Sequence, residues 1–266
     1  MPYQSFLSKI LKNASRVANK NFGQVVGILK PKSRTQILTK TDLAISRLII
    51  AAVRKNYPEH NIIDEETGVV DRHSVYTWVI DPIDGTVNFA HGVPLYGVMI
   101  GLLKQGCPIA GGVALPAFNQ IYTAEKGKGA YCNDKIIHTA KPKRGFAILS
   151  YTIGGYPEAA RAIAKKYKTL SRLLSKFFLQ TGSGSVFDSM MVAKGGYAAN
   201  LFSRSKIWDN VAEDIIITEA GGVYTDFNGR PKDYTNPLSK TKKNYTACAA
   251  HPAIHNQIQK IIHQAE

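Results

Sequence analysis

The chain has 266 residues, of which 44% are hydrophobic and 20% are charged, and it contains no run of 18 or more apolar residues. This composition is typical of a globular protein with a sizeable core, and it excludes a disordered chain and a membrane-spanning helix. Its three cysteines lack the spacing of a metal site, so we expect reduced thiols and, by default, a cytoplasmic protein.

The formal net charge of +15 is unevenly distributed. Residues 1–41 contain no acidic residue and eight basic ones: Lys9, Lys12, Arg16, Lys20, Lys30, Lys32, Arg34 and Lys40. Such a balance favours anionic partners, whether phosphorylated small molecules, nucleic acid or an acidic membrane surface. It does not choose among them.

The first half of the chain predicts two helices followed by a sheet. Apolar residues recur at helical spacing over residues 6–18, and a second helix is expected from about Thr41 to Tyr57. Short apolar runs separated by turn residues then predict strands at 75–80, 96–103, 109–115, 120–124 and 130–132. Strands at such short separations indicate an antiparallel meander.

The second half predicts alternating strands and helices, which is typical of an α/β arrangement. Strands are expected at 146–151, 177–180, 197–202, 223–225 and 245–249, and helices at 157–175, 186–194, 209–220 and 251–264. The change of pattern near residue 145 predicts two parts, 1–145 and 146–266, of which the first carries most of the candidate metal ligands described below.

Two carboxylates stand at the end of the apolar strand that precedes Asp81. The sequence there continues as Asp81-Pro82-Ile83-Asp84-Gly85-Thr86. Burying two carboxylates is costly unless a cation compensates, and Mg²⁺ prefers oxygen ligands of this kind. Gly85 permits close approach of a ligand, and a helix beginning at Thr86 would direct free amides at a phosphate. The alternative is an ordinary surface turn, because Asp-Pro and Asp-Gly are common in turns.

Other acids follow apolar runs or begin helices. Glu65 comes directly after Ile62-Ile63-Asp64, whereas Asp209 and Asp42 each stand at the start of a predicted helix. An acid in the first turn is also a common helix-start device, so each of these residues alone has a structural explanation. Their combination with Asp81 favours a metal site.

Several motifs together resemble the inositol monophosphatase family of Mg²⁺-dependent, lithium-sensitive phosphatases. The matching segments occur in the family's order: residues 65–68, 78–89, 122–127, 208–209 and 219–222. The resemblance implies a layered αβαβα sandwich, a homodimer, and two or three Mg²⁺ ions per subunit. It also implies hydrolysis of a small phosphate ester by metal activation of water.

Carried over by position, the resemblance assigns five ligand positions. It places a first metal on Glu65, Asp81 and the carbonyl of Ile83, and a second on Asp81, Asp84 and Asp209. It assigns catalytic roles to Glu65 and to a water-activating pair, and it implies a set of substrate contacts. The pair is Thr86 with Asp42, and the substrate contacts are Asp84, Gly85, Thr86, Ser185 and Asp209. Lys30 corresponds to a lysine of the family's mobile loop, with an offset of one residue.

The chain departs from the family pattern where substrate is selected. Phe202 stands where members acting on inositol phosphates have a glutamate, and phenylalanine cannot pair with ring hydroxyls. Arg204 and Lys206 follow, and they either meet a second anionic group of the substrate or are solvated loop charges. Glu213 lies one helical turn beyond Asp209, so it either approaches the metals or pairs with a lysine.

These observations leave three hypotheses. The leading one is a phosphatase of inositol-1-phosphate or a similar small polyol monophosphate. The second is a sugar bisphosphatase or a 3′-phosphoadenosine nucleotidase of the same superfamily, which Phe202, Arg204 and Lys206 favour. The third, from another class, is a protein that binds RNA or the transcription machinery through its basic N-terminal segment, although no RNA-recognition motif accompanies that segment.

Overall fold

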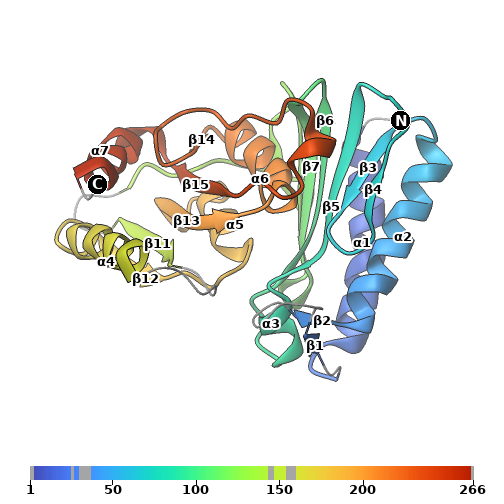
Figure 1. Cartoon of the computed structure of the whole chain (residues 1–266), viewed down its shortest axis with the longest axis horizontal. Helices are drawn as coiled ribbons and strands as arrows, with labels where there is room; N and C mark the ends of the chain where they lie inside the picture. Colours follow the sequence, from blue (N-terminus) through green and yellow to red (C-terminus); the bar gives the residue numbers. More distant parts are fainter. Residues whose placement is uncertain (1–2, 25–26, 30–36, 143–146, 154–159, 265–266) are drawn as a thin grey trace.

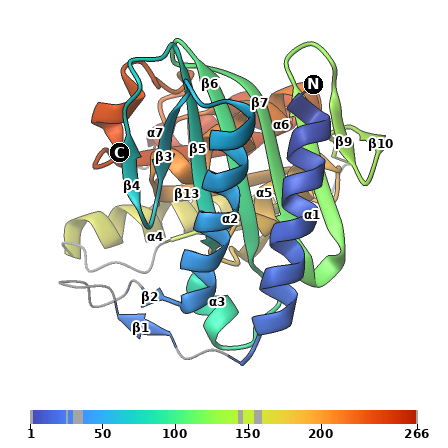
Figure 2. The same cartoon turned by 90° about the vertical axis from the view of Figure 1, so that its right-hand side faces the viewer.

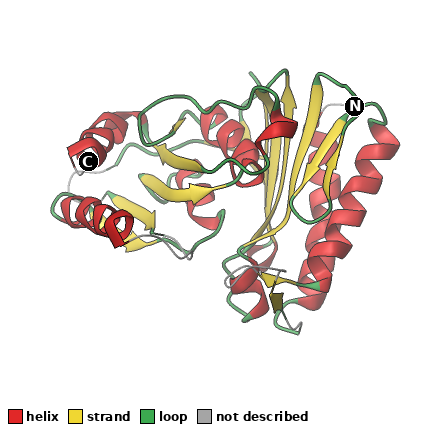
Figure 3. Cartoon of the chain, viewed as in Figure 1, coloured by secondary structure: helices red, strands yellow, loops and turns green. Residues whose placement is uncertain are grey.

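Helices and sheets alternate in five layers across the molecule (Figures 1 and 3). This computed structural model describes residues 3–24, 27–29, 37–142, 147–153 and 160–264. An eight-stranded and a five-stranded sheet enclose α5 (Phe187–Ala193) and α6 (Ile207–Glu219), and further helices cover the outer face of each sheet. The predicted αβαβα sandwich is therefore confirmed.

The outer helices of the larger sheet are α1 (Tyr3–Asn21) and α2 (Lys40–Asn56), which lie side by side across it (Figure 2). Both helices bury an apolar stripe at helical spacing, exemplified by Leu7 and Leu11 of α1 and by Ile45 and Ile49 of α2. The stripes pack with Trp78 in one hydrophobic cluster. The periodicity of the sequence thus gives both helices and the face that each one buries.

The eight-stranded sheet is antiparallel except at one pair. Its spatial order is β10-β9-β8-β7-β6-β5-β3-β4. The strands are β3 (Asn61–Asp64), β4 (Gly68–Val70), β5 (Tyr76–Asp84), β6 (Gly97–Lys104), β7 (Cys107–Leu115), β8 (Gln120–Glu125), β9 (Ala130–Cys132) and β10 (Lys135–Ile137). The predicted meander is confirmed from β5 to β9, whereas β3, β4 and β10 were not predicted as strands.

The exception is the parallel pair β3 and β5, in which Asp64 lies opposite Ile80. Parallel strands end at the same edge of a sheet, so the residues that follow β3 and the last residues of β5 come together. This pairing places Glu65 next to Asp81, although the two are 16 positions apart in the sequence.

The five-stranded sheet has the order β12-β11-β13-β15-β14. Its strands are β11 (Ile148–Thr152), β12 (Phe178–Thr181), β13 (Ala199–Ser205), β14 (Val223–Thr225) and β15 (Tyr245–Ala250). The helices predicted at 157–175 and 251–264 are present as α4 (Ala160–Leu174) and α7 (Pro252–Gln264), on the side of this sheet that faces away from α5 and α6, and residues 157–159 lie outside the described residues. All five strands agree with the predicted ones to within a few residues. Whether 1–145 and 146–266 are separate domains stays a prediction.

Short elements complete the described chain: β1 (Ile28–Leu29), β2 (Ile37–Leu38), α3 (Thr86–Ala90), η1 (Pro116–Phe118) and η2 (Pro237–Lys240). Among the helices that the structure describes, none combines the length and the apolar character needed to cross a lipid bilayer.

A glycine of β6 lets α6 approach the larger sheet. A Cβ atom on Gly101 would lie 2.5 Å from Cγ1 of Val211 and 3.0 Å from the backbone nitrogen of Ala212. Because the backbone of α6 cannot yield as a flexible side chain can, we expect Gly101→Ala to lower the free energy of unfolding by about 1–3 kcal/mol.

Urea denaturation measures this effect, and Gly196→Ala is the matched control. A Cβ on Gly196 would meet its nearest neighbour, the carbonyl oxygen of Met191, at 3.4 Å, which is ordinary contact. Equal stability of the two variants would show that α6 does not depend on the missing side chain.

Candidate functional site

The last residues of β5 leave the regular ladder. The pairing of β5 with β6 shifts between Asp81 and Asp84, and Gly85 follows with a φ of 79°. A Cβ on Gly85 would lie 2.9 Å from Cβ of Ser185 and 3.0 Å from the carbonyl oxygen of Leu95. The position therefore needs glycine both for its left-handed backbone and for space. After this turn the chain enters α3, whose first residue is Thr86.

Three carboxylates meet beside this turn. One oxygen each of Asp81, Asp84 and Asp209 lies within 4.8 Å of the other two. Asp209 comes from the first turn of α6, where the backbone N–H of Lys206 donates to its Oδ2 at 2.6 Å. Asp209 thus serves both as a helix-start acid and as a member of the cluster, so the two interpretations made from the sequence do not exclude each other.

Burial and mutual repulsion disfavour the ionised form of the three clustered aspartates. Burial, followed by the charges of neighbouring acids, raises the pKa of Asp81 and Asp209 well above the ordinary range. Burial also raises the pKa of Asp84 to about 8, against the hydrogen bond from the backbone N–H of Val186. The charge of Glu65 contributes to the raised pKa of all three.

The donor set fits a hard divalent cation. Within the described residues, Oδ1 of Asp81 is buried and has no hydrogen-bond partner. Carboxylate oxygens that converge within a few ångströms are the ligands that Mg²⁺ and related ions prefer. A bound cation would favour the ionised form of each acid and so remove the repulsion among them.

Glu65 is positioned by the acid that precedes it. The carboxylate of Asp64 accepts hydrogen bonds from the hydroxyl of Ser46 and from the backbone N–H groups of Glu66 and Thr67, at 2.8–3.1 Å. The backbone N–H of Glu65 donates to the carbonyl of Ile80 at 3.1 Å, which continues the β3–β5 pairing by one residue. Asp64 therefore fixes the turn that carries Glu65, whose charge acts on the three aspartates although its carboxylate is not one of those that converge within 4.8 Å.

Thr86 and Asp42 each have another partner in this structure. The hydroxyl of Thr86 donates to the carbonyl oxygen of Ile83 at 2.8 Å. Asp42 is fully buried at the start of α2, and its Oδ2 accepts from the backbone N–H of Thr39 at 2.8 Å and from the hydroxyl of Thr39. Burial raises the pKa of Asp42 to about 6, and the charge of Glu65 adds to the shift. The pairing of Thr86 with Asp42 stays a prediction.

A loop from the second half of the chain closes over Asp84 and Gly85. It includes Ser185, which packs against Gly85, and Val186, whose N–H donates to Asp84. Two residues that the sequence did not single out hold the loop. Asp188 accepts from the N–H and hydroxyl of Ser183 at 2.7 and 2.8 Å, and Nδ2 of Asn88 donates to the carbonyl of Ser183 at 3.0 Å. An acid in the first turn after a Gly-Ser loop was the available signal for Asp188.

Comparison with known proteins identifies the family. The model of the inositol monophosphatase family matches residues 2–265. The chain belongs to the inositol monophosphatase family. It is accordingly a phosphoric monoester hydrolase, and the family to which it belongs is metal-dependent.

Relatives of this inositol monophosphatase family member carry several names. A Pasteurella multocida protein named Nus factor SuhB is 36% identical over 201 residues, covering 74% of each chain. An Aquifex aeolicus fructose-1,6-bisphosphatase/inositol-1-monophosphatase is 33% identical over 217 residues, covering 79% of this chain and 80% of the relative. The solved inositol monophosphatase of Thermotoga maritima superposes with a TM-score of 0.85 at 26% identity, covering 100% and 98% of the two chains.

Of the residues that depart from the family pattern, Lys206 and Glu213 interact with the clustered aspartates. Phe202 of β13 is half-buried and packs against the hydrophobic cluster between the sheets. Lys206 is half-buried, and its pKa is lowered by burial and by the charge of Arg204, while Asp209 opposes the shift. Glu213 accepts a hydrogen bond from Tyr224 at 2.7 Å and lies near the charge of Lys232. Lys30 lies outside the described residues.

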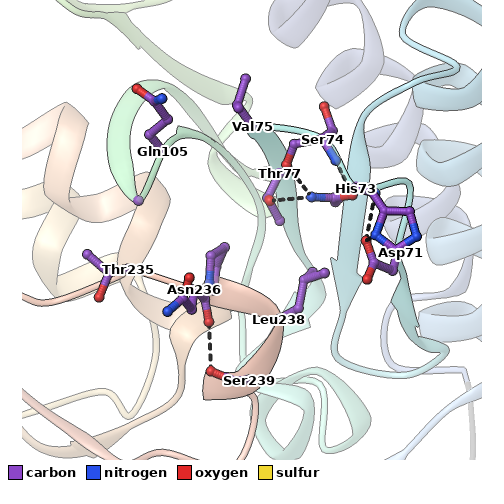
Figure 4. Close-up of a pocket in the computed structure, with 13 residues that line it drawn as sticks. Asp71, His73, Ser74, Val75, Thr77, Gln105, Thr235, Asn236, Leu238 and Ser239 are labelled. Carbon is purple, nitrogen blue, oxygen red and sulfur yellow. Dashed lines mark hydrogen bonds and ion pairs between the residues drawn. The ribbon is translucent and has the colours of Figure 1, made fainter.

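A separate cavity of about 510 Å³ lies at the opposite end of β5 (Figure 4). It is lined by segments at 71–77, 105–106 and 235–239. Asn61 borders it, but its side chain is already hydrogen-bonded to Ser74, Arg72 and Thr77. Because β5 enters the sheet here and reaches the carboxylates only at its other end, this cavity is distinct from the cluster.

Proposed function

We propose that this family member is a Mg²⁺-dependent phosphomonoesterase that hydrolyses inositol-1-phosphate or a similar small polyol monophosphate. The observation that carries the proposal is the convergence of Asp81, Asp84 and Asp209 within 4.8 Å, beside the start of α3, which has no side-chain cap. Carboxylates for a metal and amides for a phosphate are the two recognition elements that a metal-assisted phosphatase needs.

The proposed ligands are the three clustered aspartates together with Glu65 and the carbonyl oxygen of Ile83. Bound Mg²⁺ would supply charge neutralisation for the phosphate and activation of water. Hydrogen bonds orient two of these ligands: the backbone N–H of Lys206 donates to Asp209, and that of Val186 donates to Asp84. The parallel pairing of β3 with β5 brings Glu65 to the same edge of the sheet as Asp81. We expect two or three ions per subunit from the family resemblance.

The proposed phosphate contacts are the backbone N–H groups of Gly85 and Thr86 at the start of α3, with Ser185 on the facing loop. In this proposal Thr86 and Asp42 take up the proton of the attacking water. Oδ1 of Asp42 supports that role, because it is buried and has no hydrogen-bond partner within the described residues. A carboxyl whose pKa is raised to about 6 is suited to accept a proton near neutral pH.

A second candidate substrate is a bisphosphate, such as a sugar bisphosphate or a 3′-phosphoadenosine nucleotide. Arg204 and Lys206 favour it because they stand close enough for the charge of one to lower the pKa of the other. Two neighbouring cations beside Asp209 form a suitable contact for a second phosphate. Phe202 cannot make polar contacts with the ring hydroxyls of a polyol, which weakens the first candidate at the same place.

A phosphate-release panel with Mg²⁺ decides between the two substrate classes. We expect inositol-1-phosphate to be hydrolysed at least as efficiently as fructose-1,6-bisphosphate and 3′-phosphoadenosine 5′-phosphate. If a bisphosphate is preferred, Arg204→Ala should lower kcat/KM for it about tenfold, since a hydrogen bond to a charged group contributes about 1.5–3 kcal/mol. Lys242→Ala, which removes an exposed neighbouring cation, is the matched control. A bisphosphate ranking far above inositol-1-phosphate would reject the first candidate.

The sequence also predicts partners for this protein. The exposed side of α1 carries Lys9, Lys12, Arg16 and Lys20, which is compatible with binding of RNA or the transcription machinery. A basic face on a surface helix is most often only solvated, and binding that weakens steeply with salt would distinguish the two. The homodimer and the cytoplasmic location also stay predictions.

A further inference from the structure

A buried hydrogen-bond network lies behind Asp209, on the side of α6 that faces the smaller sheet. Its centre is Tyr224 of β14, which is 6% exposed. The hydroxyl of Tyr224 lies 3.0 Å from Oδ1 of Asn210 and 2.7 Å from Oε2 of Glu213. Asn210 and Glu213 are buried as well and belong to α6, so the network ties that helix to the smaller sheet.

The network continues from Asn210 to the turn that precedes α6. Nδ2 of Asn210 donates to Oγ of Ser205 at 2.9 Å and to the carbonyl oxygen of Lys206. The hydroxyl of Ser205 in turn donates to the carbonyl of Tyr245 in β15. The turn that is held in this way is the one whose backbone N–H, on Lys206, donates to Asp209 at 2.6 Å.

The hydroxyl of Tyr224 is the donor at the centre of the network. Nδ2 of Asn210 donates to both of its partners, so Oδ1 of Asn210 is the acceptor that faces Tyr224. Oε2 of Glu213 is the second acceptor for the Tyr224 hydroxyl. Tyr224 is therefore linked to two residues of α6, and Asn210 continues the link to the Ser205–Lys206 turn.

We propose that Tyr224 and Asn210 are positioning residues for Asp209, which they hold in place through the Ser205–Lys206 turn. The inference rests on the proposed role of Asp209 as a metal ligand. A carboxylate that binds a metal loses affinity when the groups that orient it are released, by about 10- to 100-fold for direct partners of the ligand. Tyr224 acts one step further away, so its effect should be smaller.

The test is Mg²⁺ binding to the metal-free protein, measured by isothermal titration calorimetry with Tyr224→Phe. We expect the dissociation constant to rise about three- to tenfold, since the direct partners of a ligand set the upper range. Thermal melting of the metal-free variant reports any general loss of stability separately. Asn210→Leu, which removes both ends of the link at similar volume, should have a larger effect and serves if Tyr224→Phe does not fold.

Tyr234→Phe is the matched control. Tyr234 is also buried, and its hydroxyl donates to Asp214 of α6 at 3.0 Å, but Asp214 is not connected to the Ser205–Lys206 turn by any hydrogen bond among the described residues. A shift in Mg²⁺ affinity for Tyr224→Phe alone supports the proposal. Equal affinities for both variants and the unaltered protein reject it. If the unaltered protein itself binds no Mg²⁺, the proposed metal site fails and this inference with it.

Discussion

Replacing Asp84 by asparagine is expected to lower Mg²⁺-dependent phosphate release by at least about a thousandfold, and Asp81→Asn should do the same. Removing one of the clustered carboxylates removes part of the charge that holds the cation. The cation accounts for several kcal/mol of transition-state stabilisation, and each 1.4 kcal/mol corresponds to about tenfold in rate. Release of inorganic phosphate from inositol-1-phosphate at saturating Mg²⁺ measures the effect.

The fold should survive this substitution, which makes the result interpretable. The backbone N–H of Val186 donates to Asp84, and the carbonyl oxygen of an asparagine can accept the same bond. Without metal, the neutral side chain also removes one of the mutually repelling charges, so the melting temperature of the metal-free variant should not fall. Activity within about tenfold of the unaltered protein would reject the metal assignment.

Asp214→Asn is the matched control for the loss of a buried acid. Asp214 lies on α6 five positions beyond Asp209, and burial raises the pKa of its carboxyl to about 6. It accepts a hydrogen bond from Tyr234 and is not among the clustered carboxylates. We expect this variant to keep most of its activity. A comparable loss in both variants would mean that activity depends on such acids in general and not on the three that converge.

The sequence was informative wherever one local pattern determines one element. The apolar run that stops at Asp81 gives the part of β5 that precedes its register shift, although the strand continues to Asp84. Gly85 gives the turn, because a side chain does not fit its left-handed backbone and its contact with Ser185. The start of α6 near Asp209 is likewise visible as an acid before a long apolar stretch. The family resemblance joined these separate signals into a single site.

What the sequence did not show depends on contacts between distant segments. β3 has only four residues, and its parallel pairing with β5 depends on the whole sheet. Asn88 holds a loop 95 positions away, and nothing in its own neighbourhood indicates that. The sequence also left the role of Glu213 open between a metal contact and a lysine partner. The structure gives it Tyr224 as a hydrogen-bond partner, 11 positions later in the chain.

Mg²⁺ is expected to stabilise the protein more strongly at pH 8 than at pH 6. In the metal-free folded protein the pKa of Asp84 is raised from its ordinary value of 3.8 to about 8, and those of Asp81 and Asp209 are raised in the same direction. Between about pH 4 and pH 8 the folded state therefore holds protons that the unfolded state has released, and the stability of the metal-free protein falls as the pH rises through this window.

Metal binding has the opposite dependence on pH. The carboxylates must lose these protons before they bind Mg²⁺, so the affinity for the ion increases over the same window. Near saturation at pH 8, with the ion at 100 times its dissociation constant, the rise in Tm should be about 5–10 °C, and it should be clearly smaller at pH 6. Differential scanning calorimetry at both pH values, with and without Mg²⁺, measures the difference.

Asp84→Asn separates the contribution of the cluster from other effects of pH. The variant lacks a titrating group at this position, so the stability of its metal-free form should depend less on pH between 4 and 8. The Mg²⁺-dependent rise in Tm should also be small at both pH values, because one ligand is missing. An equal rise at pH 6 and pH 8 in the unaltered protein would mean that the acids are already ionised at pH 6. The burial and mutual repulsion that raise the pKa values of the three carboxylates would then be too weak to keep protons on them at pH 6.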